Sequence, residues 1–514
     1  MNLFFRHIAL IISISLFPGM LSGLTENRNR DKTGKSNFIN EEISIQPDNE
    51  RLLRNPLNGW VVYGSTRAQN DFWKKYDNMN VPALGRSVKV SDYAHTLYIR
   101  SSWTDMNPED GVYGWHTDEG LKQLIQNAKD RKMRLAFRIV VDSRDKGYTF
   151  TPQFVKEAGA KGYVNRGKWS PFPDDPVFQK YFEKFIKAFA KEFNNPAEVD
   201  FIDGFSLGKW GEYHTVLYST GDNTPRKAVF EWMTGLYLKH FTKVPVVVNY
   251  HRWIGTEKDW IDDSKYDRES ESLLDDAIRK GYSLRHDAFG MGTYYGSWER
   301  RFAEKYRFRV PIIMEGGWII KKHSYWTDPR NYRRNYPQDV RLGEFEDAKE
   351  AHVNMMDFRN GETESWFEDS FELVQKFISE GGYRLYPDKV SLPIEVKNNS
   401  EIKIYHRWNN MGWGYCPTNI PQWNQKYKVA FALFDNNGQI KYTFVDHNTD
   451  LSKWIKDSPA EYEFILDTQK ISKGNYTWAV GLVDVTSENK IGLEMAVKGE
   501  FLREGWLKLA EVKF

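Results

Sequence analysis

Two glutamates occupy positions suited to acid–base and nucleophilic chemistry. Glu212 lies in the segment FSLGKWGEYH (205–214), and Glu315 lies in VPIIMEGGW (310–318). Each glutamate follows a strand-like apolar run and sits among glycines and tryptophans. Two carboxyl groups in one site can protonate a glycosidic oxygen and attack or stabilise the cationic sugar carbon. The pair therefore predicts cleavage of a glycosidic bond.

Alternating strands and helices must bring these glutamates together. Between residues 51 and 390, helical stretches separate eight apolar strand candidates, at 59–63, 96–100, 134–141, 201–207, 244–250, 288–294, 310–314 and 352–357. This pattern predicts an α/β fold of the (β/α)8 barrel type, in which loops at the carboxyl ends of the strands converge. Glu212 follows the fourth strand and Glu315 ends the seventh, so they would face each other across the barrel mouth. A doubly wound sheet is the alternative, but no Gly-x-Gly-x-x-Gly turn follows the first strand.

The C-terminal part of the chain has a different pattern. Short strand candidates without helices occur at 394–396, 401–408, 428–434, 440–445, 461–466, 476–483 and 490–497. They predict an antiparallel β-sandwich domain over residues 391–514, after a barrel over 51–390. Residues 24–50 are polar and aperiodic, which favours a flexible linker.

The first 23 residues have the features of an export signal. Arg6 and His7 precede an apolar run (8–17), and small residues follow at Ser22 and Gly23. Because a bilayer span needs about 20 apolar residues, we expect cleavage and no stable membrane anchor. Cys416 is the only cysteine, so no intramolecular disulfide can form. These features favour a periplasmic or secreted bacterial protein.

Composition limits the classes of partner. Over 514 residues the formal net charge is +2, which gives no electrostatic case for nucleic acid. The chain holds 19 Trp, 28 Tyr and 32 Phe, and such rings suit the apolar faces and hydroxyl groups of sugars. We therefore expect an oligosaccharide or polysaccharide substrate.

The segment RSSWTDMNPEDGVYGW (100–115) carries a family resemblance. It resembles the second-strand segment of family-42-type β-galactosidases, with its tryptophan, its Pro-Glu-x-Gly turn and its Tyr-x-Trp. The arrangement of Glu212 and Glu315 is similar to that of retaining clan-A glycoside hydrolases. The whole chain resembles more closely still a poorly characterised bacterial family with a Gly-x-Trp-Gly-Glu-x-His segment.

This resemblance implies roles for five residues. Glu212 would be the general acid/base and Glu315 the nucleophile of a retaining mechanism. Arg100, ending the second strand, would hydrogen-bond the nucleophile. Tyr294, ending the sixth strand, would orient it as well. Trp366, after the eighth strand, would be a platform for the sugar.

One position departs from the clan-A pattern. Those enzymes usually carry asparagine before the acid/base, where it contacts the sugar 2-hydroxyl, and here that residue is Gly211. Either His214 or Asn249 contacts the hydroxyl instead, or the substrate differs at that carbon. The departure keeps open an alternative function, a non-catalytic carbohydrate-binding protein with a degenerate barrel.

Other residues near the glutamates have competing interpretations. Trp210 would give Glu212 an apolar setting. Trp210 and Trp318 are also predicted to bind the substrate. Glu212 and His214 form half of a metal site, but no Cys/His cluster completes it, so neither metal nor cofactor is predicted. The structural alternative is that both glutamates are loop carboxylates paired to arginines.

Overall fold

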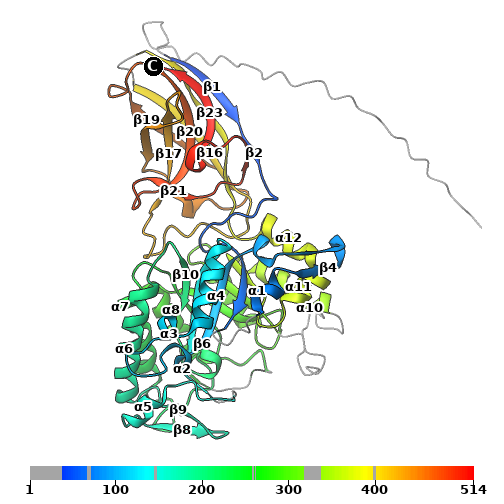
Figure 1. Ribbon diagram of the computed structural model, residues 1–514, viewed down its shortest axis with the longest axis vertical. Coiled ribbons are helices and arrows are strands. Elements are labelled where there is room, and N and C mark those ends of the chain that lie inside the picture. Colours follow the sequence, from blue (N-terminus) through cyan, green and yellow to red (C-terminus); the bar gives the residue numbers. More distant parts are fainter. Residues whose placement is uncertain are drawn as a thin grey trace, which may run out of the picture.

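Eight parallel strands close into a barrel in this computed structural model, which describes residues 38–65, 71–143, 147–256, 260, 262–317, 337–397 and 401–514. The barrel strands are β3 (Gly59–Gly64), β6 (Ala94–Ser102), β7 (Arg134–Val140), β10 (Val199–Asp203), β11 (Val246–Asn249), β12 (Ser283–Phe289), β13 (Ile312–Gly316) and β14 (Met355–Asp357). Each pairs with its neighbours along the chain, and β14 pairs with β3 to close the ring (Figure 1). The predicted (β/α)8 barrel is confirmed.

The predicted position of the sixth strand is wrong. Residues 288–294 were expected to form it, whereas β12 begins at Ser283 and ends at Phe289. Arg285 and Asp287 alternate with outward-facing residues along β12 and are buried. Because charged residues occupy every second position of β12, a search for apolar runs does not find this strand. As a result, Tyr294 lies in a turn beyond the strand.

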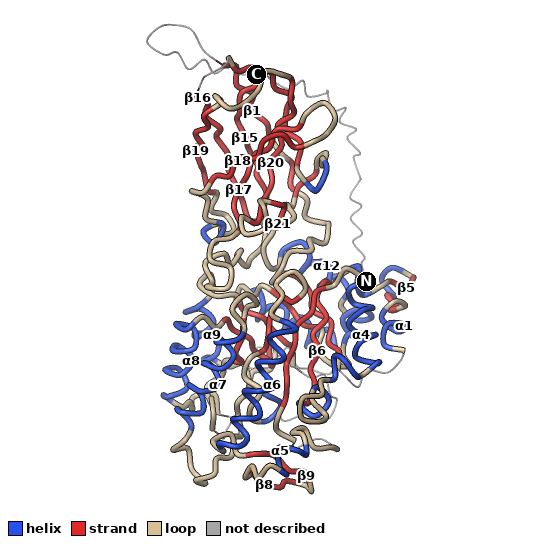
Figure 2. The backbone as a smooth tube through the Cα atoms, turned by 60° about the vertical axis from the view of Figure 1, so that its left-hand side comes forward, coloured by secondary structure: helices blue, strands red, loops and turns tan. Residues whose placement is uncertain are grey.

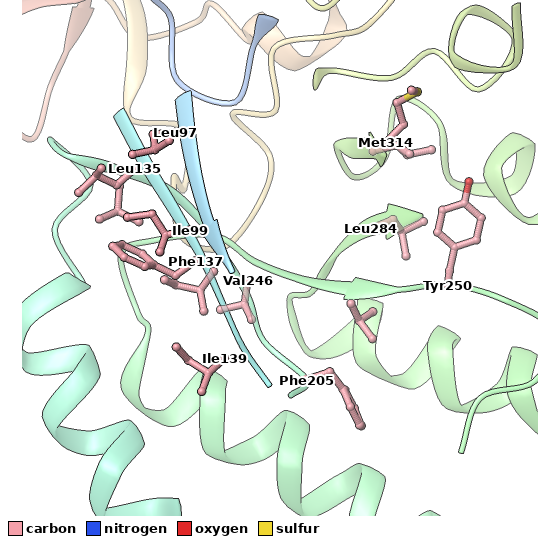
Figure 3. Close-up of a cluster of buried hydrophobic side chains, with 14 of the residues drawn as sticks. Leu97, Ile99, Leu135, Phe137, Ile139, Phe205, Val246, Tyr250, Leu284 and Met314 are labelled. Carbon is pink, nitrogen blue, oxygen red and sulfur yellow. The ribbon is translucent and has the colours of Figure 1, made fainter. Parts of the chain in front are cut away.

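Helices surround the barrel and cover the outer face of its strands. The longer ones are α4 (Glu119–Asp130), α6 (Pro176–Phe193), α7 (Arg226–His240), α8 (Arg268–Lys280), α9 (Ser297–Tyr306), α10 (Pro337–Glu350), α11 (Thr363–Asp369) and α12 (Phe371–Glu380). The short helices are α1 (Phe72–Tyr76), α2 (Trp103–Met106), α3 (Gly114–Thr117) and α5 (Gln153–Glu157). Outward side chains such as Leu97, Phe137 and Leu284 are fully buried in the main hydrophobic cluster (Figure 3).

The C-terminal domain is a β domain, as predicted. Its strands are β15 (Leu385–Val396), β16 (Glu401–Asn410), β17 (Tyr427–Phe434), β18 (Ile440–Asp446), β19 (Ala460–Asp467), β20 (Asn475–Asp484), β21 (Lys490–Leu493) and β23 (Leu507–Lys513). With β1 (Phe38–Ser44) they form one nine-stranded, mostly antiparallel sheet. Two-stranded ladders elsewhere join β2 (Gln46–Pro47) to β22 (Val497–Lys498), β4 (Met79–Val81) to β5 (Arg86–Val88), and β8 (Gly162–Asn165) to β9 (Lys168–Pro171).

The N-terminal stretch differs in part from the predicted linker. Residues 38–47, inside the expected 24–50 linker, form β1 and β2, and β1 pairs with β15 along its length. Asn40, Glu41 and Glu42 are consecutive polar residues in the middle of β1, so its sequence lacks the apolar run of a buried strand. The predicted export signal (1–23) lies outside the described residues. Among those described, no helix is both long and apolar enough to cross a bilayer.

The β domain sits at the amino-terminal end of the barrel strands. Tyr383 donates a hydrogen bond to the Pro56 carbonyl oxygen (2.6 Å), just before β3. Gln422 donates to the carbonyl oxygen of Gly281, just before β12 (3.1 Å). The β8–β9 hairpin follows β7 and lies at the other end of the barrel in Figures 1 and 2. The carboxyl ends of the strands, where barrel enzymes place their active sites, therefore point away from the β domain.

Candidate active site

Glu212 is held in a strained loop after β10. A short 3₁₀ helix (Lys209–Gly211) precedes it, and the amide of Tyr213 donates to the Leu207 carbonyl oxygen (2.9 Å). Four non-glycine residues of this loop have positive φ angles, namely Ser206, Trp210, Tyr213 and Thr215. Each such conformation costs free energy, and such residues cluster at functional sites. The strain therefore marks this loop as a candidate functional element.

Gly211 has a left-handed backbone conformation in this loop. Its φ angle is +78°, in the region that favours glycine. A Cβ atom here would lie 3.3 Å from Cδ of Arg138. An asparagine in front of Glu212 would therefore be strained and would crowd Arg138. The local backbone therefore favours glycine over asparagine at this position.

Glu315 lies on β13 and faces the barrel interior, 3% exposed. Its Oε2 accepts a hydrogen bond from Nη2 of Arg285 (2.6 Å). Its Oε1 accepts one from Nη1 of Arg359 (3.0 Å). Burial and the negative charge of Asp287 raise the pKa of Glu315, while Arg359 and Arg285 oppose the rise. Two charged donors thus favour the ionised carboxylate.

Charged side chains fill the barrel interior around Glu315. We call this group the ionic layer, and its members are Arg100, Arg138, Asp203, Arg285, Asp287, Glu315 and Asp357. The ring of Tyr98 contacts both this layer and the apolar interior: the Arg285 guanidinium lies 4.5 Å from the ring centre, and the Phe201 ring stacks on it with centroids 5.8 Å apart. Burial raises the pKa of Asp357 to about 7, with a further contribution from the charge of Glu315. The layer is a dense set of buried, mutually dependent charges.

Sequence analysis missed most of the ionic layer. Only its two members Arg100 and Glu315 were candidates, whereas Arg285 and Arg359 are the residues that hydrogen-bond Glu315. The available signal was a charged residue at every second position of a strand, as at Arg285 and Asp287 of β12. Such alternation also describes a strand with one face in water, so it does not identify a buried charge.

Glu212 has a different environment from Glu315. Its Oε1 lies 3.5 Å from Nη1 of Arg138, and its Oε2 lies 3.4 Å from Nε2 of His214. Burial and the negative charge of Asp287 raise the pKa of Glu212 to about 8. This pKa favours the protonated form of Glu212 at neutral pH.

Arg100 and Tyr294, the two residues expected to orient Glu315, have contacts with other residues. Arg100 donates from Nη1 to the Tyr63 hydroxyl (3.1 Å), so the hydrogen bonds expected from it come from Arg285 and Arg359. Its positive charge still favours ionisation of Glu315. Tyr294 lies in the turn after β12, and its ring packs on Trp260 with centroids 5.1 Å apart.

Three further candidates lie near Glu212 or along the barrel mouth. His214 contacts Glu212, and its ring packs edge-on against Trp210 with centroids 5.6 Å apart. Asn249 is the last residue of β11 and pairs in register with Arg285 of β12. Val247, two residues earlier on the same strand, belongs to the apolar interior. Asn249 therefore faces the interior on the same side as the ionic layer. His251 also lies in this group, and its Nε2 lies 2.7 Å from the Glu212 carbonyl oxygen.

Trp366 is not available as a sugar platform. Trp366 is fully buried on α11, where it packs against Trp60 with ring centroids 4.8 Å apart. The assignment of Trp366 is therefore wrong, because a ring stacks on sugar only through an accessible face. Burial against a neighbouring strand cannot be read from one residue in sequence. Trp318 lies outside the described residues.

The described side chains do not form a metal site. No group of three or more histidine, cysteine, aspartate or glutamate residues there is placed to hold a metal ion. The carboxylates of the ionic layer are instead held by arginine. The described residues offer proton transfer and nucleophilic attack by carboxyl groups.

Comparison with known proteins gives no family. No family model matches the chain, and no curated protein matches it. Solved structures with a similar backbone include an endo-β-1,4-mannanase from Thermotoga petrophila, 13% identical with TM-score 0.38, covering 90% of this chain and 98% of that one. Endo-glycoceramidase II from Rhodococcus sp., as a lactosyl-enzyme intermediate, is 12% identical with TM-score 0.37, covering 83% and 99%. Likenesses this distant carry no conclusion about the reaction.

Proposed function

We propose that this protein is a retaining glycoside hydrolase acting on a β-linked glycan. The observation that carries the proposal is a pair of carboxyl groups, one in the loop after β10 and one on β13, that have different charged partners. Glu315 accepts hydrogen bonds from two guanidinium groups, whereas the pKa of Glu212 is raised to about 8. A retaining mechanism requires one ionised and one protonated carboxyl group.

The reaction would proceed in two displacements. Glu212 donates its proton to the glycosidic oxygen as the bond from that oxygen to the anomeric carbon breaks. An oxygen of Glu315 attacks the anomeric carbon from the opposite face and forms an ester. Glu212, now a carboxylate, takes a proton from water as the water oxygen attacks the same carbon and breaks the ester. The proton is back on Glu212, and the sugar keeps its configuration.

The arginines give Glu315 its place in this scheme. Arg285 donates a hydrogen bond to Oε2 of Glu315 (2.6 Å), and Arg359 donates one to Oε1 (3.0 Å). This fixes the attacking group before substrate binds and lowers the reorganisation needed in the transition state. The resemblance to family-42-type enzymes, the export signal and the periplasmic or secreted location remain predictions alongside this proposal.

The first test is a screen of the purified protein against aryl β-glycosides and plant or algal oligosaccharides. The Glu315→Ala variant is assayed beside it, with Glu304→Ala as the control for loss of an exposed carboxyl group on α9. We expect the wild type and the control to release sugar, and Glu315→Ala to be slower by more than about 10⁴-fold. Full activity in Glu315→Ala contradicts the assignment.

Azide rescue separates the two roles. With an activated aryl glycoside, azide added to Glu315→Ala should yield the glycosyl azide of inverted configuration, because azide replaces the missing nucleophile. Added to Glu212→Ala, it should yield the retained product, since azide then attacks the ester on Glu315. If neither the wild type nor a variant releases sugar and glycan binding persists, the protein is a carbohydrate-binding barrel instead.

A further inference from the structure

Asp287 lies between the two proposed catalytic glutamates. It faces the barrel interior on β12, and Nε of Arg285 donates to its Oδ1 (2.7 Å). The same guanidinium donates from Nη2 to Oε2 of Glu315 (2.6 Å). One arginine therefore holds Asp287 and Glu315 side by side.

A second arginine connects Asp287 to the other glutamate. Nη1 of Arg138 lies 2.5 Å from Oδ2 of Asp287 and 3.5 Å from Oε1 of Glu212. Each oxygen of Asp287 thus has its own arginine, and each arginine also reaches one glutamate. Asp287 is the residue that links the two ends of the proposed reaction.

Asp287 and Glu212 share one arginine nitrogen. Nη1 of Arg138 lies 2.5 Å from Oδ2 of Asp287 and 3.5 Å from Oε1 of Glu212. The negative charge of each carboxylate disfavours ionisation of the other, so the pair favours a state that holds one proton. Asp287 has close contacts with two guanidinium groups, at 2.7 and 2.5 Å, which favour its ionised form. Glu212 has one arginine contact, at 3.5 Å, so the proton belongs on Glu212.

We propose that Asp287 is a positioning residue that keeps the catalytic proton on Glu212, a role that rests on the function proposed above. Its carboxylate accepts a hydrogen bond from protonated Glu212 before the first displacement. Once Glu212 has given up the proton, two carboxylates face each other, and their repulsion makes Glu212 a stronger base. The same contact therefore favours removal of a proton from water in the second displacement.

The surrounding charges agree with this assignment. Burial opposes ionisation of Asp287, but Arg138 and Arg285 outweigh it and hold the pKa of Asp287 well below its ordinary value. The titratable and charged groups that face this pair from the packed elements are Arg100 and Tyr98 on β6, Arg138 on β7, Asp203 on β10, His214 and His251 in the loops, Arg285 on β12, Glu315 on β13 and Asp357 on β14.

Infrared titration tests the proposal without any substrate. The wild type at pH 7 should show the carbonyl stretch of a protonated carboxyl group that is missing in Glu212→Gln. In Asp287→Asn this band should disappear at a pH lower by at least about one unit, because a negative charge next to Glu212 is gone. Asp287→Glu keeps the charge and should keep the band at pH 7.

Kinetics give the second readout once a substrate is known. The alkaline limb of the kcat/KM profile should move to lower pH in Asp287→Asn by at least about one unit, with much smaller changes near pH 5. An unmoved limb, or a wild type without a Glu212-dependent band at pH 7, overturns the proposal. If Asp287→Asn does not fold, the wild-type titration and Asp287→Glu still decide. Because the infrared band needs no catalysis, it separates this proposal from failure of the hydrolase assignment.

Discussion

The two ends of the barrel interior have opposite chemistry. Toward the amino-terminal ends of the strands, Val61, Phe201, Val247 and Ile313 are fully buried, in one hydrophobic cluster with the core of the β domain. Toward the carboxyl-terminal ends, the interior holds the ionic layer. The β domain excludes water from one end, and its apolar contacts stabilise the barrel there. This leaves the other end able to hold buried charges, which are costly to desolvate.

Single strands contribute to both ends. On β13, Ile313 belongs to the apolar interior, and Glu315, two residues later, belongs to the ionic layer. On β12 the same side of the strand runs from Ser283 to Arg285 and Asp287. Since side chains alternate between faces along a strand, two residues are enough to pass from one layer to the next. Substitutions in the two layers therefore make matched pairs.

Arg285→Ala is expected to have the largest effect, because it removes the group shared by Glu315, Asp287 and Asp357. Leaving buried carboxylates without their partner should lower the free energy of unfolding by about 3–5 kcal/mol. Misplacement of Glu315 should lower kcat about 10²-fold in the molecules that stay folded. Urea unfolding measures the first quantity, and kinetics normalised to folded protein measure the second. An unchanged unfolding midpoint would show that the ionic layer contributes little to stability.

The next largest effect is a dependence of folding stability on pH that comes from Glu212. Its pKa is about 8 in the folded protein against an ordinary value of 4.5, so the folded state binds the proton more tightly between these values. Stability from this group is therefore full at low pH and is lost as pH rises, by up to about 1.4 kcal/mol per unit. Buried His95, His251 and His286 have lowered pKa values and act in the opposite direction, so wild type alone is not diagnostic.

The difference between wild type and Glu212→Gln isolates this contribution. Urea unfolding at pH 5, 6, 7 and 8 should show a stability that falls more steeply with pH in the wild type than in Glu212→Gln. Parallel curves for the two proteins would mean that Glu212 titrates normally. In that case its contacts with Arg138 and His214 would favour its ionised form.

The smallest effect is expected in the apolar layer. Ile313→Val removes one buried methyl group and should lower the free energy of unfolding by about 1 kcal/mol. Because Ile313 lies one layer away from Glu315 on the same strand, kcat should stay within about twofold and the pH profile should not move. Thermal unfolding and kinetics on the same preparation measure both. A large loss of activity would show that packing in one layer determines the geometry of the other.

The sequence predicted the elements better than the interior. Seven of the eight barrel strands were placed within a few residues, since they carry apolar runs bounded by helices. β12 was misplaced because Arg285 and Asp287 interrupt its apolar pattern. Trp366 was assigned to a sugar because its type suits that role, and its burial against Trp60 depends on a strand some 300 residues earlier.

By itself, the sequence determined the barrel, the β domain and the two strand ends that carry Glu212 and Glu315. Periodicity and turn residues are local properties, and barrel closure then brings strand ends to one mouth. Only the tertiary structure decided which arginines hold Glu315, why Gly211 is a glycine and where Asp287 lies. These depend on distances across the barrel between residues far apart in the chain. The protonation state of each carboxyl group follows from those distances, because burial and neighbouring charge set its pKa.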